Sequence, residues 1–310
     1  MTTSGDAEQL INVVCRDLLG SAAQQEIFIS IRVSSVYGVR LADGRDVVIK
    51  VHPTSGSLTR LRAVHRLQLK LADTGFPCPR PVIAPVSLPG HGPIAVEYMV
   101  TGGEPGRPRD PAHRRAMVEA FHWHTELLRD QPATAELLEP PGWADLRTRP
   151  GIWPAPHDPA LRFEADPDAS WIDDMAGAAL AALRPFSEPV TIAHCDWESQ
   201  NMRFDNARVH VVWDWDSLLA GRASCLIGFA AGCHTAQGRQ GISDAPTVAE
   251  VSLFLDEYAE VSGRSWTTAR RRAAAASALW LIAYNARIEH ASAAADKPWS
   301  TALSIDYLHA

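Results

Sequence analysis

The segment that most limits what this chain can fold into begins at His194 and ends at Asn201, and a strand that ends at Asp214 follows it after a short hairpin. The first part has the pattern His-x-Asp-x-x-x-x-Asn, and in the second part Val211 and Val212 lead into Trp-Asp-Trp-Asp. A loop followed by an apolar strand in this order offers one catalytic carboxylate and two oxygen ligands for a divalent ion.

The residue types of this segment match the chemistry of phosphoryl transfer. That reaction asks the protein to position a hydroxyl, to neutralise phosphate charge with magnesium and to hold both partners in line. Asp196 would accept or orient the hydroxyl proton, while Asn201 and Asp214 would supply the hard oxygen ligands that suit Mg²⁺. His194 would brace the loop. Either motif alone arises by chance in loops, but their joint occurrence in this order favours the functional interpretation.

These residues resemble the aminoglycoside phosphotransferase and choline kinase-like superfamily, which shares the protein-kinase fold. The family's catalytic loop resembles His-Gly-Asp-x-x-x-x-Asn, and here Cys195 stands at the Gly position. The resemblance extends from about residue 25 to about residue 290, with 192–216 as its specific part. It implies an α+β, protein-kinase-like two-lobe fold whose small lobe has an antiparallel five-stranded sheet plus a helix and whose large lobe is mainly helical. It also implies ATP and Mg²⁺ as cofactors.

The length of 310 residues exceeds what one hydrophobic core usually serves, which favours two lobes. We expect an N-terminal nucleotide-binding lobe at 1–100 and a C-terminal catalytic and substrate-binding lobe at 101–310. The hinge is expected at about 97–103. An insertion rich in Pro and Trp, at about 131–190, lies where the family places substrate-binding elements.

The charge and the hydropathy of the chain exclude several classes of partner. A net charge of -7 argues against a nucleic-acid partner, because a phosphate backbone demands a basic surface. The start MTTSGDAEQL lacks a basic and then apolar leader, and no run approaches the roughly 18 apolar residues that a membrane span needs. We therefore expect no membrane partner and a cytoplasmic protein.

The five cysteines are odd in number, scattered and without a CxxC pair, so neither a disulfide framework nor a zinc site is indicated. Reduced and mostly buried thiols are the favoured interpretation. Cys195 lies within the catalytic loop, which suggests the hypothesis that the enzyme is sensitive to thiol reagents.

The N-terminal part predicts three antiparallel strands, at 26–32, 36–41 and 46–51, with a hairpin turn at Asp43 and Gly44. Lys50 is a lone cation in the apolar run VVIKV of the third strand, and it resembles the kinase lysine that contacts the α- and β-phosphates. The alternative is a lysine that faces solvent on an edge strand.

Two features near Lys50 depart from the family pattern. The loop around Ser34 and Ser35 is not Gly-rich, although the small Ser residues can still donate hydrogen bonds to phosphate. The helix expected at 57–73 contains no acid before Asp73, so the sequence does not identify the group that orients Lys50.

Two further strands are expected at 82–88 and 93–100, separated by a turn. The second strand leads to Gly102 and Gly103, which resemble the hinge between lobes. The resemblance implies that backbone groups of Glu97 to Met99 contact adenine.

The large lobe is expected to be rich in helices, with one that starts at Pro111 behind the cap Asp110 and others at 247–262 and 266–294. Two His residues two positions apart on the first of these, His122 and His124, point to different faces, which favours packing or surface roles over a metal pair.

The insertion at 131–190 carries ten acidic residues against four arginines. An acidic rim would attract a cationic acceptor such as an aminoglycoside or another amine-bearing alcohol, whereas the alternative is a solvated acidic face. The chain therefore predicts a phosphotransferase that phosphorylates a hydroxyl of a small molecule. Asp216 would lie on the same side of the strand as Asp214, in a supporting shell or on the substrate.

Two rival functions remain from the sequence. A nucleotide-binding pseudokinase is favoured by the missing helix Glu and the absent Gly-rich loop, and it predicts ATP binding without turnover. A metal-dependent phosphohydrolase would use the same Asp cluster to release phosphate from esters without ATP. The sequence does not identify the acceptor, the choice of ATP or GTP, or the oligomeric state.

Overall fold

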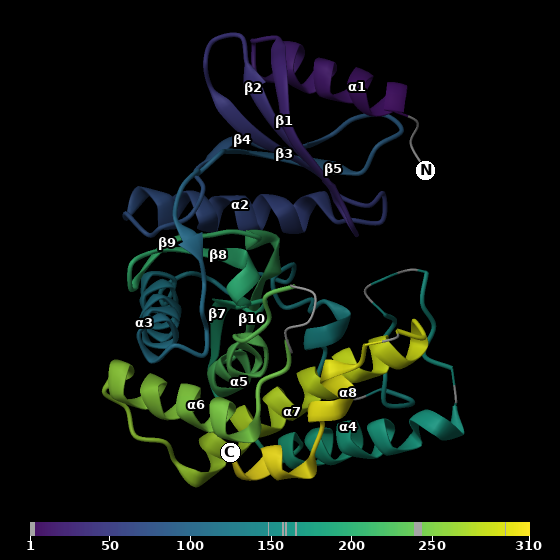
Figure 1. The fold of residues 1–310 in the computed structure, drawn as a ribbon, viewed down its shortest axis with the longest axis vertical. Coiled ribbons are helices and arrows are strands. Elements are labelled where there is room, and N and C mark those ends of the chain that lie inside the picture. The colour runs from purple at the N-terminus through teal and green to yellow at the C-terminus, as the bar shows by residue number, and fades with distance from the viewer. Residues whose placement is uncertain are drawn as a thin grey trace. The chain divides into compact units, whose positions relative to one another are not determined.

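The computed structural model describes residues 4–147, 149–156, 158, 160–164, 166–238, 244–294 and 296–310. The chain forms two compact units, Met1–Thr101 and Gly102–Ala310 (Figure 1). The second unit starts with Gly102 and Gly103, whose φ angles of +91° and +70° lie in the left-handed region that favours glycine. The boundary between the units therefore depends on two residues without a side chain.

The first unit is built on a five-stranded antiparallel sheet, as expected. Its strands are β1 (Ala23–Ile31), β2 (Ser35–Leu41), β3 (Asp46–Val51), β4 (Pro81–Ser87) and β5 (Pro93–Tyr98). Their order across the sheet is β1-β2-β3-β5-β4, so β3 is the central strand. Gly44, with a φ of +87°, forms the predicted hairpin turn between β2 and β3.

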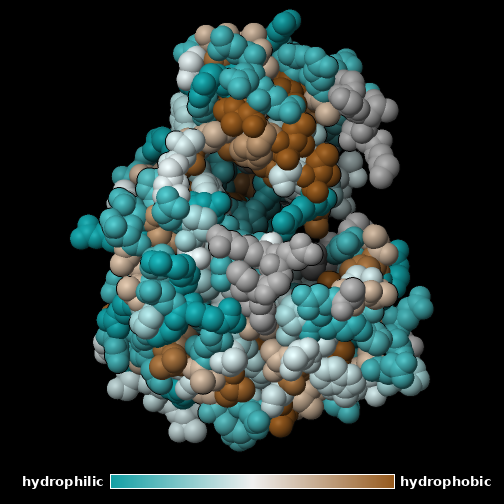
Figure 2. All heavy atoms as spheres, viewed as in Figure 1, coloured by the Kyte–Doolittle hydropathy of each residue, from teal (hydrophilic) through white to brown (hydrophobic). Residues whose placement is uncertain are grey.

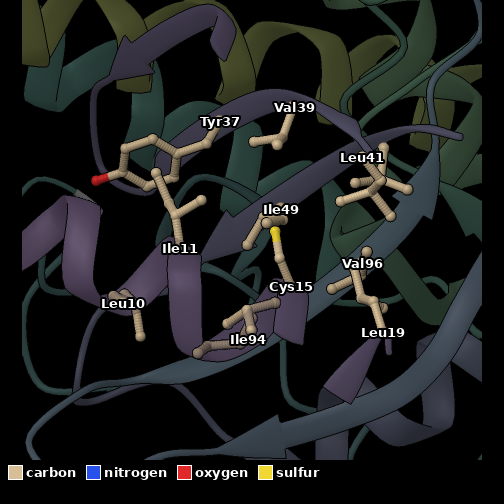
Figure 3. Close-up of a cluster of buried hydrophobic side chains, with 12 residues drawn as sticks. Leu10, Ile11, Cys15, Leu19, Tyr37, Val39, Leu41, Ile49, Ile94 and Val96 are labelled. Carbon is tan, nitrogen blue, oxygen red and sulfur yellow. The ribbon is translucent and has the colours of Figure 1, made fainter. Parts of the chain in front are cut away.

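One face of this sheet is covered by the N-terminal helix α1 (Ser4–Val13) and the π-helical turn η1 (Val14–Leu18) that extends it (Figure 1). The alternation of the strands turns Tyr37, Ile49 and Val96 toward this face, where they are buried. Figure 3 shows them packed around Ile11 and Cys15. This core fixes which residues of each strand point to the opposite face.

The helix α2 (Leu58–Asp73) begins behind the cap Ser57, whose hydroxyl accepts a hydrogen bond of 3.2 Å from the N–H of Arg60. It buries a stripe spaced as the sequence predicts, including Leu61, Val64 and Leu71. The helix packs mainly along β4 and also touches β5. It therefore lies on the sheet side opposite α1.

Strand β1 is an edge strand and leaves an unusual number of apolar side chains exposed. Ile27, Phe28, Ile29 and Ile31 are 39 to 69% exposed. Figure 2 shows apolar side chains gathered on the visible face of this unit. Edge strands of soluble proteins are protected by charge, Pro, a bulge, short length or a covering element, whereas this strand exposes apolar side chains.

The second unit is mainly helical, as expected. Its helices are α3 (Pro111–Leu127), α4 (Ser170–Leu183), α5 (Ala223–Cys233), α6 (Val248–Ser262), α7 (Thr268–Ala291) and α8 (Pro298–Ala302). The cap of α3 is Asp110, which accepts hydrogen bonds from the N–H groups of Ala112 and His113, as the sequence predicts. None of the helices in the described part of the chain combines the length and apolar character needed to cross a membrane.

Helices α5 and α7 approach each other closely because small residues face each other at their crossing. A Cβ on Gly228 would come within 2.1 Å of the carbonyl oxygen of Ala274, and one on Gly232 within 3.1 Å of the Cα of Ala278. Only glycine fits at the first of these positions without a shift of backbone. Helix α5 follows directly after the strand that packs beside the catalytic loop.

The strands of the second unit frame that loop. They are β6 (Glu104–Pro105), β7 (Val190–His194), β8 (Met202–Asp205), β9 (Arg208–Val212) and β10 (Leu218–Arg222). Strand β7 pairs with β10, and β8 pairs with both β6 and β9. The turn between β8 and β9 contains Asn206 with a φ of +55°, which completes the short hairpin expected after Asn201.

Candidate active site

The expected catalytic loop connects the end of β7 to the start of β8. Strand β7 delivers His194 opposite Leu218 of β10, and one 3₁₀ turn, η4 (Ser199–Asn201), closes the loop. The loop is therefore anchored at both ends by paired strands. The whole loop, from His194 to Asn201, belongs to the second unit.

Asn201 holds Asp196 in place. The amide nitrogen Nδ2 of Asn201 donates to the carbonyl oxygen of Asp196 at 3.1 Å and to its Oδ2 at 3.0 Å. The amide oxygen Oδ1 of Asn201 is the atom that a metal would take, because Nδ2 is a donor. One side chain thus orients the carboxylate and carries the oxygen that the sequence assigns to the cation.

A set of hydrogen bonds joins the catalytic loop to the segment that carries Asp214. The Nε2–H of His194 donates to the carbonyl oxygen of Trp213 at 3.0 Å, and the N–H of Trp213 donates to the carbonyl oxygen of Asn201 at 2.9 Å. The thiol of Cys195 donates to the carbonyl oxygen of Ser217 at 2.9 Å. His194 therefore braces the two loops, in line with the role expected for it.

The buried thiol of Cys195 bears on the hypothesis of reagent sensitivity. The residue has no exposed surface and its sulfur is engaged by Ser217. A reagent would reach it only after local opening, since thiolate reactivity needs access as well as a low pKa. The structure therefore argues against the expected sensitivity at this position.

His124 and Trp197 connect the loop to helix α3, a role that the sequence did not predict. The His194 N–H donates to Nε2 of His124 at 3.1 Å, while the Nδ1–H of His124 donates to the carbonyl oxygen of Ala120 at 3.2 Å. The His124 ring stacks on Trp197 at 4.9 Å, and the indole N–H of Trp197 donates to the Met117 carbonyl at 3.1 Å. The loop thus rests on helix α3.

Asp214 lies just after β9 in a left-handed conformation, with φ +66° and ψ +43°. Such a conformation is uncommon for residues other than glycine, is best tolerated by Asn and Asp, and tends to occur at functional sites. The next residues form a 3₁₀ turn, η5 (Trp215–Ser217). The expectation that Asp216 shares a strand face with Asp214 is therefore wrong, because β9 ends at Val212 and strand alternation does not reach Asp216.

The pKa of the Asp196 carboxyl is raised by burial and by neighbouring negative charges. Burial is the largest cause of a pKa that lies well above the ordinary value of this carboxyl. The charges of Glu198, Asp214 and Asp216 raise it further. The hydrogen bond from Asn201 acts in the opposite direction. Three neighbouring acidic side chains thus act on Asp196.

The negative charge around Asp196 fits a cation. In the described residues, no three or more His, Cys, Asp or Glu side chains converge as a metal cluster. Mg²⁺ commonly takes one or two carboxylates and completes its shell with water and substrate phosphates. The pair formed by Asn201 and Asp214 is a donor set of that kind.

Lys50 lies on β3, the central strand of the sheet in the first unit, and its neighbours are Val36 on β2 and Ala95 on β5. The alternative of a lysine on an edge strand is therefore excluded. Because Ile49 is turned to the α1 core, Lys50 belongs to the opposite face of the sheet. That face also bears Gly38, where a Cβ would lie 2.3 Å from the Phe28 ring.

The other residues expected to bind nucleotide also lie in the first unit. Ser34 is in the tight turn after β1, where its carbonyl oxygen accepts from the N–H of Arg32 at 3.0 Å, and Ser35 starts β2. The N–H of Met99 donates to the carbonyl oxygen of Asp46 at 2.9 Å. This one donor is thus engaged within the first unit, and the contact of backbone groups of Glu97 to Met99 with adenine stays a prediction.

The side chain of Glu97 is turned toward helix α2. Its Oε2 accepts a hydrogen bond of 2.9 Å from Nε2 of Gln68, and the neighbouring N–H of Tyr98 donates to the carbonyl oxygen of Arg80 at 2.9 Å. Besides the backbone contact that the sequence implied, Glu97 therefore links strand β5 to helix α2 through its side chain.

The acidic residues of the insertion are partly neutralised by basic neighbours. Among the residues that the structure describes, several of the ten form ion pairs: Asp145 with Arg147 and Arg149, Glu139 with Arg147, Asp166 with His290, Asp173 with Arg287, and Glu188 with Arg270. The charge that remains to attract a cation is smaller than the count of acids in the sequence suggests.

Comparison with solved structures shows the same fold in several kinases. An amicoumacin kinase in complex with AMP-PNP, Ca²⁺ and Ami superposes with a TM-score of 0.70 at 11% identity, covering 100% of this chain and 95% of that one. A choline/ethanolamine kinase family protein from Mesorhizobium loti gives 0.57 at 14% identity, over 97% and 91%. A macrolide 2'-phosphotransferase from Brachybacterium faecium gives 0.55 at 17% identity, over 97% of each chain.

Comparison of sequences leads to the family. No curated protein matches the chain. The sequence model of the phosphotransferase enzyme family, in contrast, matches residues 28–275, which is most of the chain and includes both Lys50 and the loop from His194 to Asp214. The chain therefore belongs to the phosphotransferase enzyme family, and it is a small-molecule kinase.

Proposed function

We propose that the protein transfers the γ-phosphoryl group of ATP, with Mg²⁺, to a hydroxyl of a small molecule. One observation carries the proposal: Asp196 is fixed by two hydrogen bonds from Asn201, and the backbone of Asn201 is bonded to the residue before Asp214. The base and the two oxygen donors are thus held together before any ligand arrives. Such preorganisation is what phosphoryl transfer requires of a protein.

Asp196 acts as the base in this proposal. It accepts the proton of the acceptor hydroxyl as the acceptor oxygen forms a bond to the γ-phosphorus and the bond to ADP breaks. The carboxylate must be ionised to accept this proton, and a nearby cation favours its ionised form. Asn201 keeps the carboxylate directed during this step.

Asn201 and Asp214 hold the metal. Mg²⁺, when bound, neutralises charge on the phosphate oxygens. The negative charge gathered around Asp196 is relieved by the same cation, so the site and the cofactor complement each other. Asp216, in the turn that follows, supports this group from outside or contacts the acceptor.

The first unit, residues 1–100 in our sequence division, binds the nucleotide. Lys50 contacts phosphate from the central strand, and Ser34 and Ser35 contribute hydroxyls from the turn that precedes β2. Because Gly38 has no side chain, the Phe28 ring and the Met99 side chain lie close against its backbone, and these apolar groups would form one wall for the adenine ring. The second unit, residues 101–310, provides the base and the metal ligands.

The acceptor is a small molecule that carries a hydroxyl and, we infer, an amine. Solved relatives of the fold include an amicoumacin kinase and a macrolide 2'-phosphotransferase. The paired acids of the insertion weaken the case for an acidic rim, but Glu198 adds a carboxylate next to Asp196 beyond the assigned base and metal ligands. An ammonium group on the acceptor would pair with the Glu198 carboxylate, which also accepts a hydrogen bond from the side chain of Gln200.

The test is ADP release in the presence of Mg²⁺ over a panel of aminoglycosides, macrolides, choline-like alcohols and sugars. We expect at least one acceptor to stimulate release, and Asp196→Ala to lower kcat by about 10²- to 10⁴-fold. Asp205→Ala changes an exposed acid in the neighbouring hairpin and is the matched control. Equal rates for wild type and Asp196→Ala on every acceptor would refute the proposal. Phosphate release from esters without ATP would support a phosphohydrolase instead.

A further inference from the structure

Helix α2 presents an amide, and not a carboxylate, to the sheet face that carries Lys50. The only acid on the helix is Asp73 at its last position, and that side chain forms an ion pair with Arg80. Protein kinases use a Glu on the corresponding helix to orient the lysine. A different group has to perform this task here if Lys50 is to be held toward phosphate.

Gln68 is the buried polar residue of α2 and is only 7% exposed. Its Nε2 donates to the carbonyl oxygen of Pro79 at 2.9 Å and to Oε2 of Glu97 at 2.9 Å. A side-chain amide has two N–H donors, and both are used. Gln68 therefore fixes the Glu97 carboxylate against the inner side of α2, with one carboxylate oxygen engaged.

The strand register brings Glu97 near Lys50. Ala95 on β5 lies directly opposite Lys50 on β3, and Glu97 lies opposite Val48. Residues two apart on one strand share a face, so Glu97 and Lys50 are diagonal neighbours on the same face. Diagonal pairs on adjacent strands lie about 7 to 8 Å apart at Cα, which two long side chains can span. The small Ala95 leaves space for the lysine to lean across.

We propose that Glu97, supplied by β5 and held by Gln68, is the positioning residue that orients the ammonium group of Lys50 for the nucleotide phosphates. The inference rests on the proposed function, and it deepens that function by naming the residue that takes the place of the helix Glu. The carboxylate accepts from the lysine, while its Oε2 also accepts from Gln68. In this chain the partner of the lysine comes from the sheet.

The negative charge of Glu97 also acts on the thiol of Cys78, which lies in the segment between α2 and β4. The pKa of the Cys78 thiol is raised to about 12, first by burial and then by the negative charge of Glu97. The Cys78 sulfur donates to the carbonyl oxygen of Gln68 at 3.8 Å. An ionised carboxylate in such a partly buried place needs a cation nearby, and Lys50 is on the same face.

The location of the pair has a mechanistic consequence. Where the acid is on a helix, a shift of that helix breaks the ion pair and turns the enzyme off. Adjacent hydrogen-bonded strands cannot separate in the same way without loss of the sheet. A shift of α2 would therefore break the hydrogen bond from Gln68 to Glu97 but would leave Glu97 and Lys50 on adjacent, hydrogen-bonded strands.

The experiment compares four variants of the full chain. Glu97→Gln removes the charge but keeps an oxygen that accepts from Gln68. Gln68→Glu combined with Glu97→Gln moves the acid to the helix and should rescue the loss. Lys50→Ala reports whether the lysine matters at all, and Glu8→Gln, which changes an exposed acid on α1, is the control.

Two measurements are made on each variant. The first is steady-state ADP release, separated into kcat and the KM for ATP. The second needs no turnover: acetylation of Lys50 by a limiting amine-selective ester, quantified by peptide mass spectrometry in the absence of nucleotide. A lysine that loses an opposing charge has a lower pKa and reacts faster. Circular dichroism and thermal melting check that each variant is folded.

We expect Glu97→Gln to lower kcat/KM for ATP about 10- to 100-fold, as loss of a hydrogen bond between charged groups does. Acetylation of Lys50 should rise about 10-fold, which corresponds to a pKa about one unit lower. The double variant should recover a large part of both. Glu8→Gln should match wild type.

The two proposals fail in different ways. If Lys50→Ala lowers activity while Glu97→Gln leaves both activity and acetylation unchanged, the positioning role is refuted and the kinase assignment stands. If neither wild type nor any variant turns over ATP with any acceptor, the proposed function fails. The acetylation result still decides the role of Glu97 in that case.

Discussion

Two buried histidines should make the stability of this protein fall steeply in mild acid. His124 and His234 have no exposed surface. Burial lowers the pKa of His124 to about 3 and of His234 to about 4, from an ordinary value of 6.5. The Nε2 of His124 must also stay unprotonated because it accepts the His194 N–H. Both rings are therefore neutral in the folded protein.

The direction of the effect follows from proton binding. Below pH 6.5 the unfolded chain takes up a proton on each ring and the folded protein does not, so unfolding is favoured. The stability contributed by the neutral rings is complete above pH 6.5 and decreases as the pH falls toward the folded pKa values. At pH 5 the difference of about 1.5 pH units costs about 2 kcal/mol for each histidine.

The assay is urea unfolding of wild type at pH 7.5 and pH 5.0, followed by circular dichroism. We expect the free energy of unfolding to fall by about 4 kcal/mol from these two residues, a large part of the total stability of a typical protein. His124→Gln retains an acceptor for the loop but cannot titrate, so it should be less stable at pH 7.5 and should lose about 2 kcal/mol less on acidification.

The control is His309→Gln, which changes an exposed histidine near the C-terminus. The reasoning is refuted if His124→Gln and His234→Gln both show the same pH-dependent loss as wild type. A ¹³C–¹H correlation spectrum gives an independent check, since the Cε1 resonance of His124 should keep its neutral position to pH 5.

Three further predictions concern the loop and its surroundings. Asn201→Ala should lower kcat by at least about 10²-fold, because it removes the hydrogen bonds that hold Asp196. It should also raise the Mg²⁺ concentration needed for half-maximal rate, because it removes an oxygen donor. An unchanged Mg²⁺ requirement in a rate titration would contradict the metal role. Gly228→Ala should destabilise the protein by about 3 kcal/mol, measured by thermal unfolding, because its Cβ would meet the Ala274 carbonyl oxygen; a melting temperature equal to wild type would contradict the close approach of α5 and α7. Thiol titration with an aromatic disulfide should be slow for the native protein and reveal five thiols after denaturation, because Cys195 and the other cysteines are buried or half-buried; rapid reaction of Cys195 would refute the burial argument.

The small unit was predictable because its strands carry a strong alternation. In β3 the buried Val47 and Ile49 alternate with Val48 and Lys50, which is the period of a sheet that is covered on one side by a core. The β2–β3 turn and the cap of α3 were predictable for a local reason, since Gly44 and Asp110 act within a few residues of their own position.

The helices α4 and α5 were not predicted, and the reason differs for each. Helix α5 is buried on every side, so its sequence shows no amphipathic period. Helix α4 lies in a stretch that is broken by Pro and charged residues, where composition masks a single short helix. Burial and neighbouring helices, and not local pattern, determine both.

Within the candidate site, the residues of the motif were predictable and their supports were not. Asp196, Asn201 and Asp214 were named from spacing, and the structure brings their segments together. The support from His124 and the link between Gln68 and Glu97 connect residues 70 and 29 positions apart, for which a single sequence has no signal. The turn at Asp216 was missed because a strand pattern was extended past Val212.

The close crossing of α5 and α7 has a consequence for laboratory evolution of this enzyme. Helix α5 ends at Cys233, whose pKa is raised by burial and by the charges of Glu198 and Asp196, so its end lies close to the carboxylates of the candidate active site. The carbonyl oxygen of Ala236, just beyond it, accepts the N–H of Gln200 in the catalytic loop at 3.0 Å. Mutational libraries aimed at new acceptors should therefore leave Gly228 unchanged and diversify exposed positions. A larger residue at the crossing would displace α5, and the displacement would extend to the loop that carries Asp196.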